Sequence, residues 1–215
     1  MNKLSDEIIN SYFKNQFKKT LEIIVFSYNQ ILNNDKKVDK NQTNKHLENT
    51  LTNILVKEIR TNKAKFGLSL FSFEVEPGEI DDAYHNKGFI DIKVGNITSK
   101  FNNENNEDIY FAFECKRLDL SNKPRLYVKE GIERFKAEKY SKNMSIAGMI
   151  GYCELNQSNI PKIVDKINNY LDENEQLILS NFMDFDFCYQ SIHNRLNLSK
   201  IHLHHLIFDY SQIIN

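Results

Sequence analysis

The apolar residues of this chain change their spacing from a helical period to strand alternation, and this change restricts the fold most strongly. Residues 5–32 place apolar side chains three or four positions apart over many turns, which predicts a long amphipathic helix. A polar loop is expected at 33–44. A second helix follows it, with Leu47, Leu51 and Ile59 along its apolar stripe.

Beyond the second helix the apolar pattern becomes shorter and alternates. Residues 67–75, 88–94 and 109–116 are rich in aromatic and β-branched residues and predict three strands. Five further elements are expected in the order helix, strand, helix, strand and strand, at 123–142, 145–153, roughly 159–178, 183–189 and 200–208. This succession predicts a mixed α/β sandwich.

The length of 215 residues is enough for one domain with a real hydrophobic core. Neither an internal repeat nor a clear linker divides the sequence. We therefore expect a single domain over 1–215. Its parts are an N-terminal helical element at 1–40, a core at 45–153, and a C-terminal helix and strands at 154–215.

Composition excludes several classes of protein. The apolar runs are too short to span a membrane, and charged residues interrupt the first helix, so it does not read as a secretory signal. The cysteines, Cys115, Cys153 and Cys188, are odd in number and widely spaced, which favours reduced thiols in a cytoplasm. The glycine-rich phosphate loops of ATPases and dinucleotide enzymes are missing, as is the serine-hydrolase elbow.

Two neighbouring strands carry acidic and basic residues at positions that share a face. Alternation sets Ile90, Ile92 and Val94 on one face of the segment 88–94 and leaves Asp91 on the other. In the next strand, Glu114 and Lys116 lie two positions apart and therefore point the same way. Asp91, Glu114 and Lys116 can thus meet at one point.

Burial of the carboxylate within Phe-Ala-Phe-Glu-Cys-Lys costs free energy unless the carboxylate is paired or binds a cation. Lys116 is one partner. A divalent metal is another, because hard oxygen ligands hold Mg²⁺, and a lysine beside the metal can orient an attacking water. This is the minimum set of groups for hydrolysing a phosphodiester.

These residues resemble the motif of the PD-(D/E)xK nuclease superfamily. The resemblance covers roughly 45–153 and rests on Glu48 in a helix, Asp91 in Gly-Phe-Ile-Asp-Ile-Lys, and Glu114 and Lys116 in Phe-Ala-Phe-Glu-Cys-Lys-Arg-Leu. Ile90 stands where the family's motif has proline. The resemblance implies a restriction-endonuclease-like mixed sheet flanked by helices, here with an N-terminal helical extension and with 45–153 as the catalytic core. It also implies that Asp91, Glu114 and Glu48 bind Mg²⁺ or Mn²⁺, and that Lys116 is the catalytic lysine.

Glu48 and the basic residues after Lys116 can also be interpreted as ordinary surface residues. Helical phase puts Glu48 at the edge of the buried stripe, where it can reach toward a sheet or remain a rim glutamate. The stretch 116–142 is locally basic although the whole chain has a net charge of −1. Arg117, Arg134 and Lys139 are candidate nucleic-acid contacts there; the alternative is a solvated helix face.

Two other groups of residues invite a metal interpretation. His202 and His204 would share one strand face, but without a third ligand nearby we interpret the three histidines at 202, 204 and 205 as strand residues at a sheet rim or subunit contact. The acidic run Glu74, Glu76, Glu79, Asp81 and Asp82 would complete a second metal site or form a solvated loop, and His85 is a general-base candidate.

The sequence therefore predicts a cytoplasmic metal-dependent nuclease that acts on nucleic acid, favouring DNA, in restriction, antiphage defence or repair. A homodimer and a partner defence protein are expected partners, with the long N-terminal helix as a dimer face or packed on its own domain. The alternatives are a non-catalytic nucleic-acid-binding or protein-interaction module with the same fold, and an unrelated α/β protein in which Glu114 and Lys116 are structural.

Overall fold

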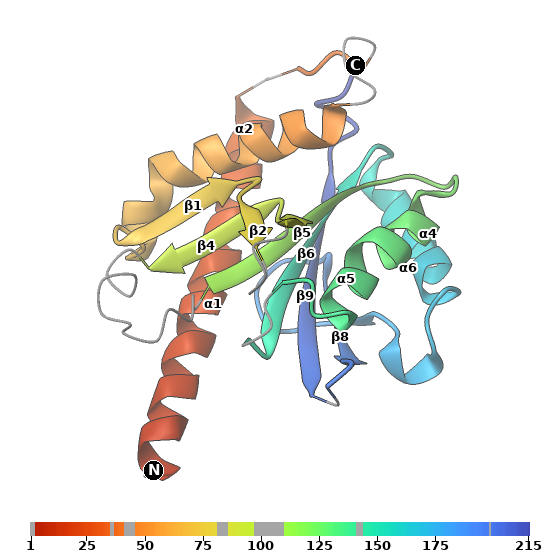
Figure 1. The fold of residues 1–215 in the computed structure, drawn as a ribbon. Helices are drawn as coiled ribbons and strands as arrows, with labels where there is room; N and C mark the ends of the chain where they lie inside the picture. Colours follow the sequence, from red (N-terminus) through yellow and green to blue (C-terminus); the bar gives the residue numbers. More distant parts are fainter. Residues whose placement is uncertain are drawn as a thin grey trace.

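The computed structural model describes residues 3–34, 37–40, 46–80, 86–96, 110–140, 144–197 and 199–215. Within them a seven-stranded mixed sheet forms the centre of the molecule (Figure 1). Its strands, in spatial order, are β1 (Phe71–Val75), β4 (Ile92–Asn96), β5 (Tyr110–Leu118), β6 (Ile146–Cys153), β9 (Lys200–Asp209), β8 (Cys188–Asn194) and β7 (Ile178–Leu179). Strands β5, β6 and β9 run parallel, and the outer neighbours are antiparallel. The predicted mixed α/β architecture is confirmed.

The predicted strand 88–94 is wrong, because the chain bends at Asp91. Strand β3 (Asn86–Phe89) pairs with β2 (Gly78–Ile80) in a separate two-stranded ribbon, and β4 begins only after the bend. Two backbone hydrogen bonds make the bend, from Ile90 N–H to Pro77 O and from Glu76 N–H to Asp91 O. Ile90 therefore packs on the opposite side of the sheet from the apolar residues of β4.

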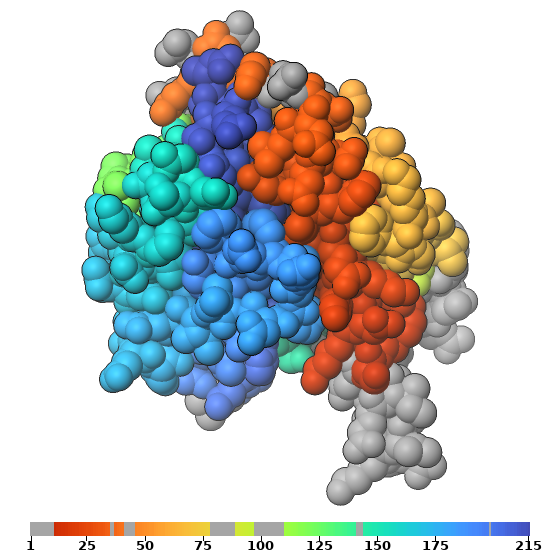
Figure 2. Space-filling model, turned by 180° about the vertical axis from the view of Figure 1, so that it is seen from behind, coloured from red at the N-terminus to blue at the C-terminus, as the bar shows by residue number. Residues whose placement is uncertain are grey.

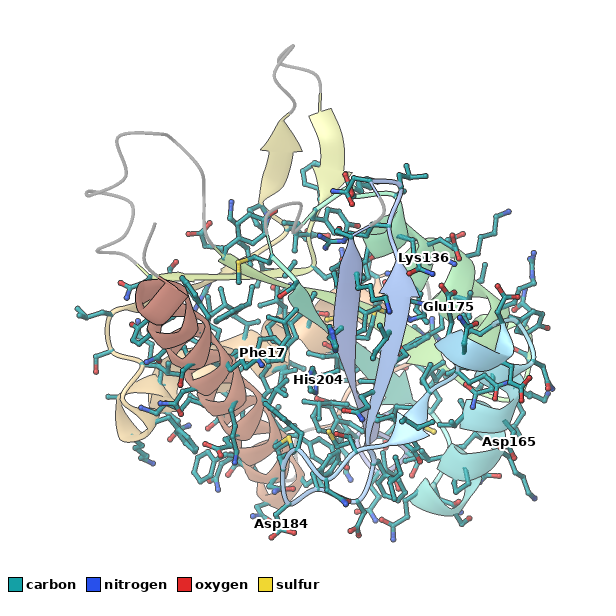
Figure 3. All side chains as sticks on the ribbon, turned by 90° about the horizontal axis from the view of Figure 1, so that it is seen from below. Phe17, Lys136, Asp165, Glu175, Asp184 and His204 are labelled. Atoms are coloured by element: carbon teal, nitrogen blue, oxygen red, sulfur yellow. The ribbon has the colours of Figure 1, made fainter. Side chains whose placement is uncertain are left out.

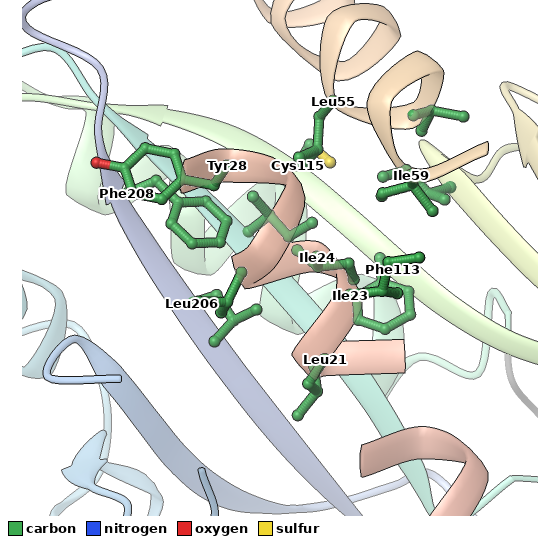
Figure 4. Close-up of a cluster of buried hydrophobic side chains, with 14 of the residues drawn as sticks. Leu21, Ile23, Ile24, Tyr28, Leu55, Ile59, Phe113, Cys115, Leu206 and Phe208 are labelled. Atoms are coloured by element: carbon green, nitrogen blue, oxygen red, sulfur yellow. The ribbon is translucent and has the colours of Figure 1, made fainter. Parts of the chain in front are cut away.

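Helices α1 (Lys3–Asn33) and α2 (Leu47–Asn62), the latter extended by the 3-10 turn η1 (Lys63–Phe66), cover one face of the sheet. Figure 2 shows α1 on the outside of this face, beside the C-terminal part of the chain. Its inner side chains Leu21, Ile24 and Tyr28 pack with α2 and with Phe113 and Phe208 of the sheet (Figure 4). The long predicted helix is confirmed, and this part of α1 packs on its own domain.

Shorter helical segments cover the other face. They are α4 (Lys123–Tyr127), the π turn η2 (Val128–Ile132), α5 (Glu133–Lys136), the 3-10 turn η3 (Gln157–Asn159), α6 (Ile160–Asn168) and the 3-10 turn η4 (Glu173–Glu175). The faces of β5 alternate between the two layers, since Phe111, Phe113 and Cys115 join the core under α1, whereas Tyr110 and Ala112 join the core under α4–α6.

Three predicted boundaries in the C-terminal half of the chain are wrong. The helix predicted at 123–142 ends at Lys136, and Glu138 has a positive φ of 54°. The helix predicted to reach 178 ends at Asn168, whose side chain binds the backbone N–H and carbonyl of Leu177 at 2.8 and 3.1 Å and so draws the chain back. The strand predicted at 183–189 is a turn over most of its length, and β8 begins at Cys188.

A close approach between β6 and β5 allows no side chain at Gly148. A Cβ atom there would lie 2.1 Å from Cδ1 of Phe113, whose ring is stacked on Phe17 with centroids 5.7 Å apart. We expect Gly148→Ala to lower the free energy of unfolding by about 1–3 kcal/mol, the usual cost of overpacking a core. Chemical denaturation measures this, with Gly95→Ala as the control, because its Cβ would meet nothing closer than 3.9 Å. Equal stabilities of the two variants would contradict the prediction.

Candidate active site

The middle of β5 brings together the four side chains that the motif predicts. Lys116 places its Nζ 2.8 Å from Glu114 Oε1. The same nitrogen lies 3.2 Å from Glu48 Oε1 and 3.4 Å from Asp91 Oδ2. Three carboxylates from β5, α2 and the bend before β4 thus converge on one ammonium group.

Backbone contacts fix the two acids that lie outside β5. Asp91 Oδ2 accepts a hydrogen bond from Cys115 N–H at 2.6 Å, so the bend before β4 is anchored on the middle of β5. Glu48 lies in the first turn of α2, and its Oε2 accepts a hydrogen bond from Arg117 N–H at 3.0 Å. Each carboxylate therefore uses one oxygen to contact Lys116 and is held by a β5 amide.

The cluster is buried on one side and open on the other. Glu114 is fully buried and the Lys116 side chain is 10% exposed, whereas Asp91 and Glu48 are 19% and 30% exposed. Burial opposes the charge of Lys116, but the carboxylates of Asp91, Glu114 and Glu48 outweigh it and raise its pKa well above the ordinary lysine value. Lys116 is therefore an ammonium near neutral pH.

Glu114 has two further hydrogen-bond partners in the chain segment that follows β5. Its Oε1 accepts a hydrogen bond from Arg134 Nη1, and its Oε2 accepts one from Tyr140 Oη at 2.9 Å. Tyr140 Oη also lies 3.1 Å from Arg134 Nη1. Burial, together with the charge of Asp91, raises the pKa of Glu114 to about 6 against the opposing pull of Lys116 and Arg134.

Sequence reasoning missed Tyr140 and gave Arg134 a different partner. The guanidinium of Arg134 faces Glu114, and its predicted contact with a phosphate stays a prediction. The sequence did indicate that further hydrogen-bond donors must reach Glu114, because a buried carboxylate needs donors for both oxygens. The sequence does not show which donors reach Glu114, since Arg134 follows a π turn and Tyr140 follows the early end of α5.

The carboxylate oxygens of Glu48, Asp91 and Glu114 are suitable ligands for a divalent cation, but they are not arranged as a complete coordination site. Within the described ranges, no three His, Cys, Asp or Glu side chains are grouped closely enough to hold a metal ion as they stand. The Lys116 ammonium lies between the carboxylates instead. The three acids nevertheless outnumber Lys116 and Arg134, so the cluster keeps a negative charge beside the exposed oxygens of Asp91 and Glu48. Hard oxygen ligands with surplus negative charge are what Mg²⁺ and Mn²⁺ require.

The other predicted contacts for nucleic acid lie near the cluster. Arg117 Nε is 2.7 Å from Glu154 Oε1, and Lys139 Nζ lies 5.9 Å from the ring centroid of Tyr140. Lys136 pairs with Glu175 at 2.8 Å. Much of the basic stretch is therefore paired with acids, which the local count of charges did not reveal; Lys142 lies outside the described residues.

In the acidic run before β3, Glu76 makes a contact with α2. Glu76 Oε1 accepts a hydrogen bond from Asn49 Nδ2 at 2.8 Å, which ties the end of β1 to the first turn of α2. Asp81, Asp82 and His85 lie outside the described residues, and so the second metal site stays a prediction.

Comparison with known proteins gives no relative. No protein-family model, curated protein or solved structure matches this chain. Among the described helices, none has both the length and the apolar character needed to cross a membrane. The functional argument therefore depends on the geometry and chemistry of the cluster around Lys116.

The C-terminal histidines are not at a sheet rim, because β9 lies between β6 and β8 in the interior of the sheet. His204 packs between the rings of Phe17 and Phe182, and Figure 3 shows it facing Phe17. His205 is fully buried and lies 2.9 Å from Tyr127 Oη and 2.8 Å from Ser191 Oγ. The rim prediction is wrong for these two residues, and only His202 of the three is exposed.

Ser191 continues this buried chain of hydrogen bonds. Its Oγ lies 2.6 Å from His193 Nε2, and His193 Nδ1 lies 3.2 Å from Glu175 Oε2. These spacings are those of a serine hydrolase triad, but Ser191 is 3% exposed and also bonded to His205. A nucleophile needs access to its substrate, so we interpret the chain as a buried polar network that joins β8 and β9 to the helices.

Proposed function

We propose that this protein is a metal-dependent nuclease that hydrolyses phosphodiester bonds, with DNA as the favoured substrate. The observation that carries the proposal is the convergence of Glu48, Asp91 and Glu114 on the ammonium of Lys116. The mixed sheet has its acid-x-lysine pair on β5 and its aspartate at the start of the neighbouring strand, which supports a restriction-endonuclease-like fold.

The residues of the cluster divide the chemistry among them. Asp91 and Glu114 would hold Mg²⁺ or Mn²⁺, with Glu48 as a further ligand; the bound ion would supply positive charge for the phosphate and its leaving oxygen. Lys116 orients the attacking water and offsets charge that develops in the transition state. Arg134 and Tyr140 hold the Glu114 carboxylate in place.

The cellular setting proposed for this activity is the cytoplasm, where the three buried cysteine thiols would stay reduced. The proposed role is restriction or antiphage defence, with a homodimer to cut both strands and a partner defence protein to direct it. A second candidate is a non-catalytic nucleic-acid-binding or protein-interaction module. The direct ion pairs of Lys116 favour this second candidate, because they compensate the charge of the carboxylates without a metal.

Cleavage assays separate the two candidates. We expect the wild-type protein to cut plasmid DNA or single-stranded DNA in Mg²⁺ or Mn²⁺ and to be inactive in EDTA. Asp91→Asn, which keeps the size and removes the charge, should reduce cleavage to the EDTA level. Asp165→Asn is the matched control, since Asp165 lies on the outer side of α6 (Figure 3) and should leave cleavage unchanged.

Cleavage that survives Asp91→Asn would refute the assigned site. If the folded wild type cleaves neither DNA nor RNA in either metal but still binds nucleic acid in EDTA, the binding module is the correct function.

A further inference from the structure

A second charged cluster lies beside the candidate active site, centred on Glu154. This residue follows β6, donates its backbone N–H to Leu118 O at 2.9 Å, and has a side chain only 2% exposed. Its Oε1 accepts hydrogen bonds from Arg117 Nε at 2.7 Å and from Lys123 Nζ. Its Oε2 lies 2.8 Å from Lys40 Nζ. Three cations from three separate segments thus meet on one carboxylate.

A second carboxylate contacts one of these cations. Asp119 Oδ2 lies 2.9 Å from Lys123 Nζ, so Lys123 contacts both Asp119 and Glu154. Burial alone would raise the pKa of Glu154, but hydrogen bonds from Arg117, Lys123 and Lys40 lower it to about 2. The carboxylate is therefore ionised near neutral pH and holds the three cations together.

The cations also keep part of their surface open to solvent. The side chains of Lys40, Lys123 and Arg117 are 46%, 20% and 13% exposed, whereas the carboxylate that organises them is buried. The partly exposed ammonium and guanidinium groups can therefore contact an anion that approaches from outside.

Glu48 links this cluster to the candidate active site. Its Oε1 contacts Lys116, and its Oε2 accepts the backbone N–H of Arg117, the next residue along β5. The cationic cluster therefore lies next to the carboxylate cluster, at the carboxyl ends of β5 and β6. A nucleic acid strand that presents one phosphate to the carboxylates and metal would bring a neighbouring phosphate toward these cations.

We propose that Lys40, Arg117 and Lys123, organised by Glu154, form a subsite that binds a backbone phosphate of the nucleic acid strand beside the cleaved bond. This inference rests on the proposed nuclease function and names the part of the substrate that the site recognises. Contacts to phosphate carry no sequence information, so the subsite fixes the register of the strand and not the sequence at which it is cut.

The test measures binding without cleavage. A fluorescently labelled single-stranded oligothymidylate is titrated with protein in EDTA at several salt concentrations, and affinity is followed by fluorescence anisotropy. The double variant Lys40→Gln and Lys123→Gln should bind at least several-fold more weakly. The slope of log affinity against log salt should become shallower by about one for each phosphate that the variant no longer neutralises. The matched control replaces the exposed Lys57 and Lys162 by glutamine and removes the same net charge.

The outcomes decide the proposal whether or not the protein cleaves. Equal affinity and equal slope in the double variant and its control would overturn the subsite and leave a purely structural ion cluster. A wild type that binds no oligonucleotide in EDTA would overturn it as well. If the double variant does not fold, the single variant Lys40→Gln replaces it in the same assay, because Lys40 has the most exposed side chain of the three. Loss of cleavage in Asp91→Asn tests the nuclease proposal, and weaker binding of the double variant than of its control tests the subsite, so the two proposals can fail separately.

Discussion

Replacing Lys116 by methionine should lower the free energy of unfolding by about 3–5 kcal/mol in metal-free buffer at neutral pH. The substitution keeps the length of the side chain but removes the charge that lies 2.8 Å from the fully buried Glu114. Glu48 and Asp91 would lose their shared partner as well, and Arg134 would be the remaining cation on Glu114. Chemical denaturation in EDTA measures the loss, and Lys57→Met on the exposed side of α2 is the matched control.

The same variant should respond to metal more strongly than the wild type. Without the ammonium, three carboxylates share a space that a divalent cation can fill, and a ligand that binds only the folded state stabilises it. At a free metal concentration of 100 times Kd the gain is about 2.7 kcal/mol. We therefore expect Mn²⁺ to recover much of the missing stability of Lys116→Met. Cleavage should still fall by about 100-fold or more, because the transition-state stabilisation that we propose for Lys116 is missing.

Two results would contradict this interpretation. A variant as stable as the wild type in EDTA would mean that the ion pairs of Lys116 contribute little. A variant that is destabilised but unaffected by Mn²⁺ or Mg²⁺ would mean that the three carboxylates do not form a metal site, which would favour the binding module.

The sequence was most informative where local geometry decides the outcome. Glu114 and Lys116 are two residues apart on one strand, so alternation alone predicts a shared face, and the structure places them in contact. Helical phase brought Glu48 to the edge of the buried stripe, and its side chain does reach Lys116. The identities of these three residues could therefore be predicted without knowledge of the tertiary contacts.

The sequence was least informative where distant segments decide the outcome. The bend at Asp91 depends on hydrogen bonds that Glu76 and Pro77 make with residues more than ten positions later. Tyr140 reaches Glu114 only because the helical segment ends early. The position of β9 between β6 and β8, which buries His204, depends on the order of strands in the sheet, and local spacing does not give that order.

Burial of the C-terminal histidines should make the protein unstable in mild acid. Burial and the neighbouring His202 lower the pKa of His204 to about 4. Burial also lowers the pKa of His193, against the opposing charge of Glu175. Burial also lowers the pKa of His205 well below the ordinary histidine value, with added repulsion from His193 and His204. The unfolded chain, with histidine pKa values near 6.5, binds more protons below that pH, so stability falls as pH drops.

His204 alone should account for a loss of roughly 2 kcal/mol between pH 7 and pH 5 by this linkage. Its Nδ1 has no hydrogen-bond partner among the described residues, and aromatic rings flank it, so leucine is a fair replacement. His204→Leu should therefore unfold with a clearly weaker dependence on pH. His202→Leu, at the exposed position two residues earlier, should stay much closer to the dependence of the wild type, because burial is the larger cause of the lowered pKa of His204.

The variants must be compared with one another because the titration of Glu114, in the candidate active site, changes stability with pH in the opposite direction. The raised pKa of Glu114, about 6, favours its protonated form in the folded state, so that carboxyl gains stability as pH falls toward 4.5. Glu154, with its pKa lowered to about 2, loses its contribution only below about 4.5. Denaturation at pH 7 and pH 5 for His204→Leu, His202→Leu and wild type cancels these common contributions. Identical pH dependence in all three proteins would show that His204 is protonated in the folded state, contrary to its place between Phe17 and Phe182.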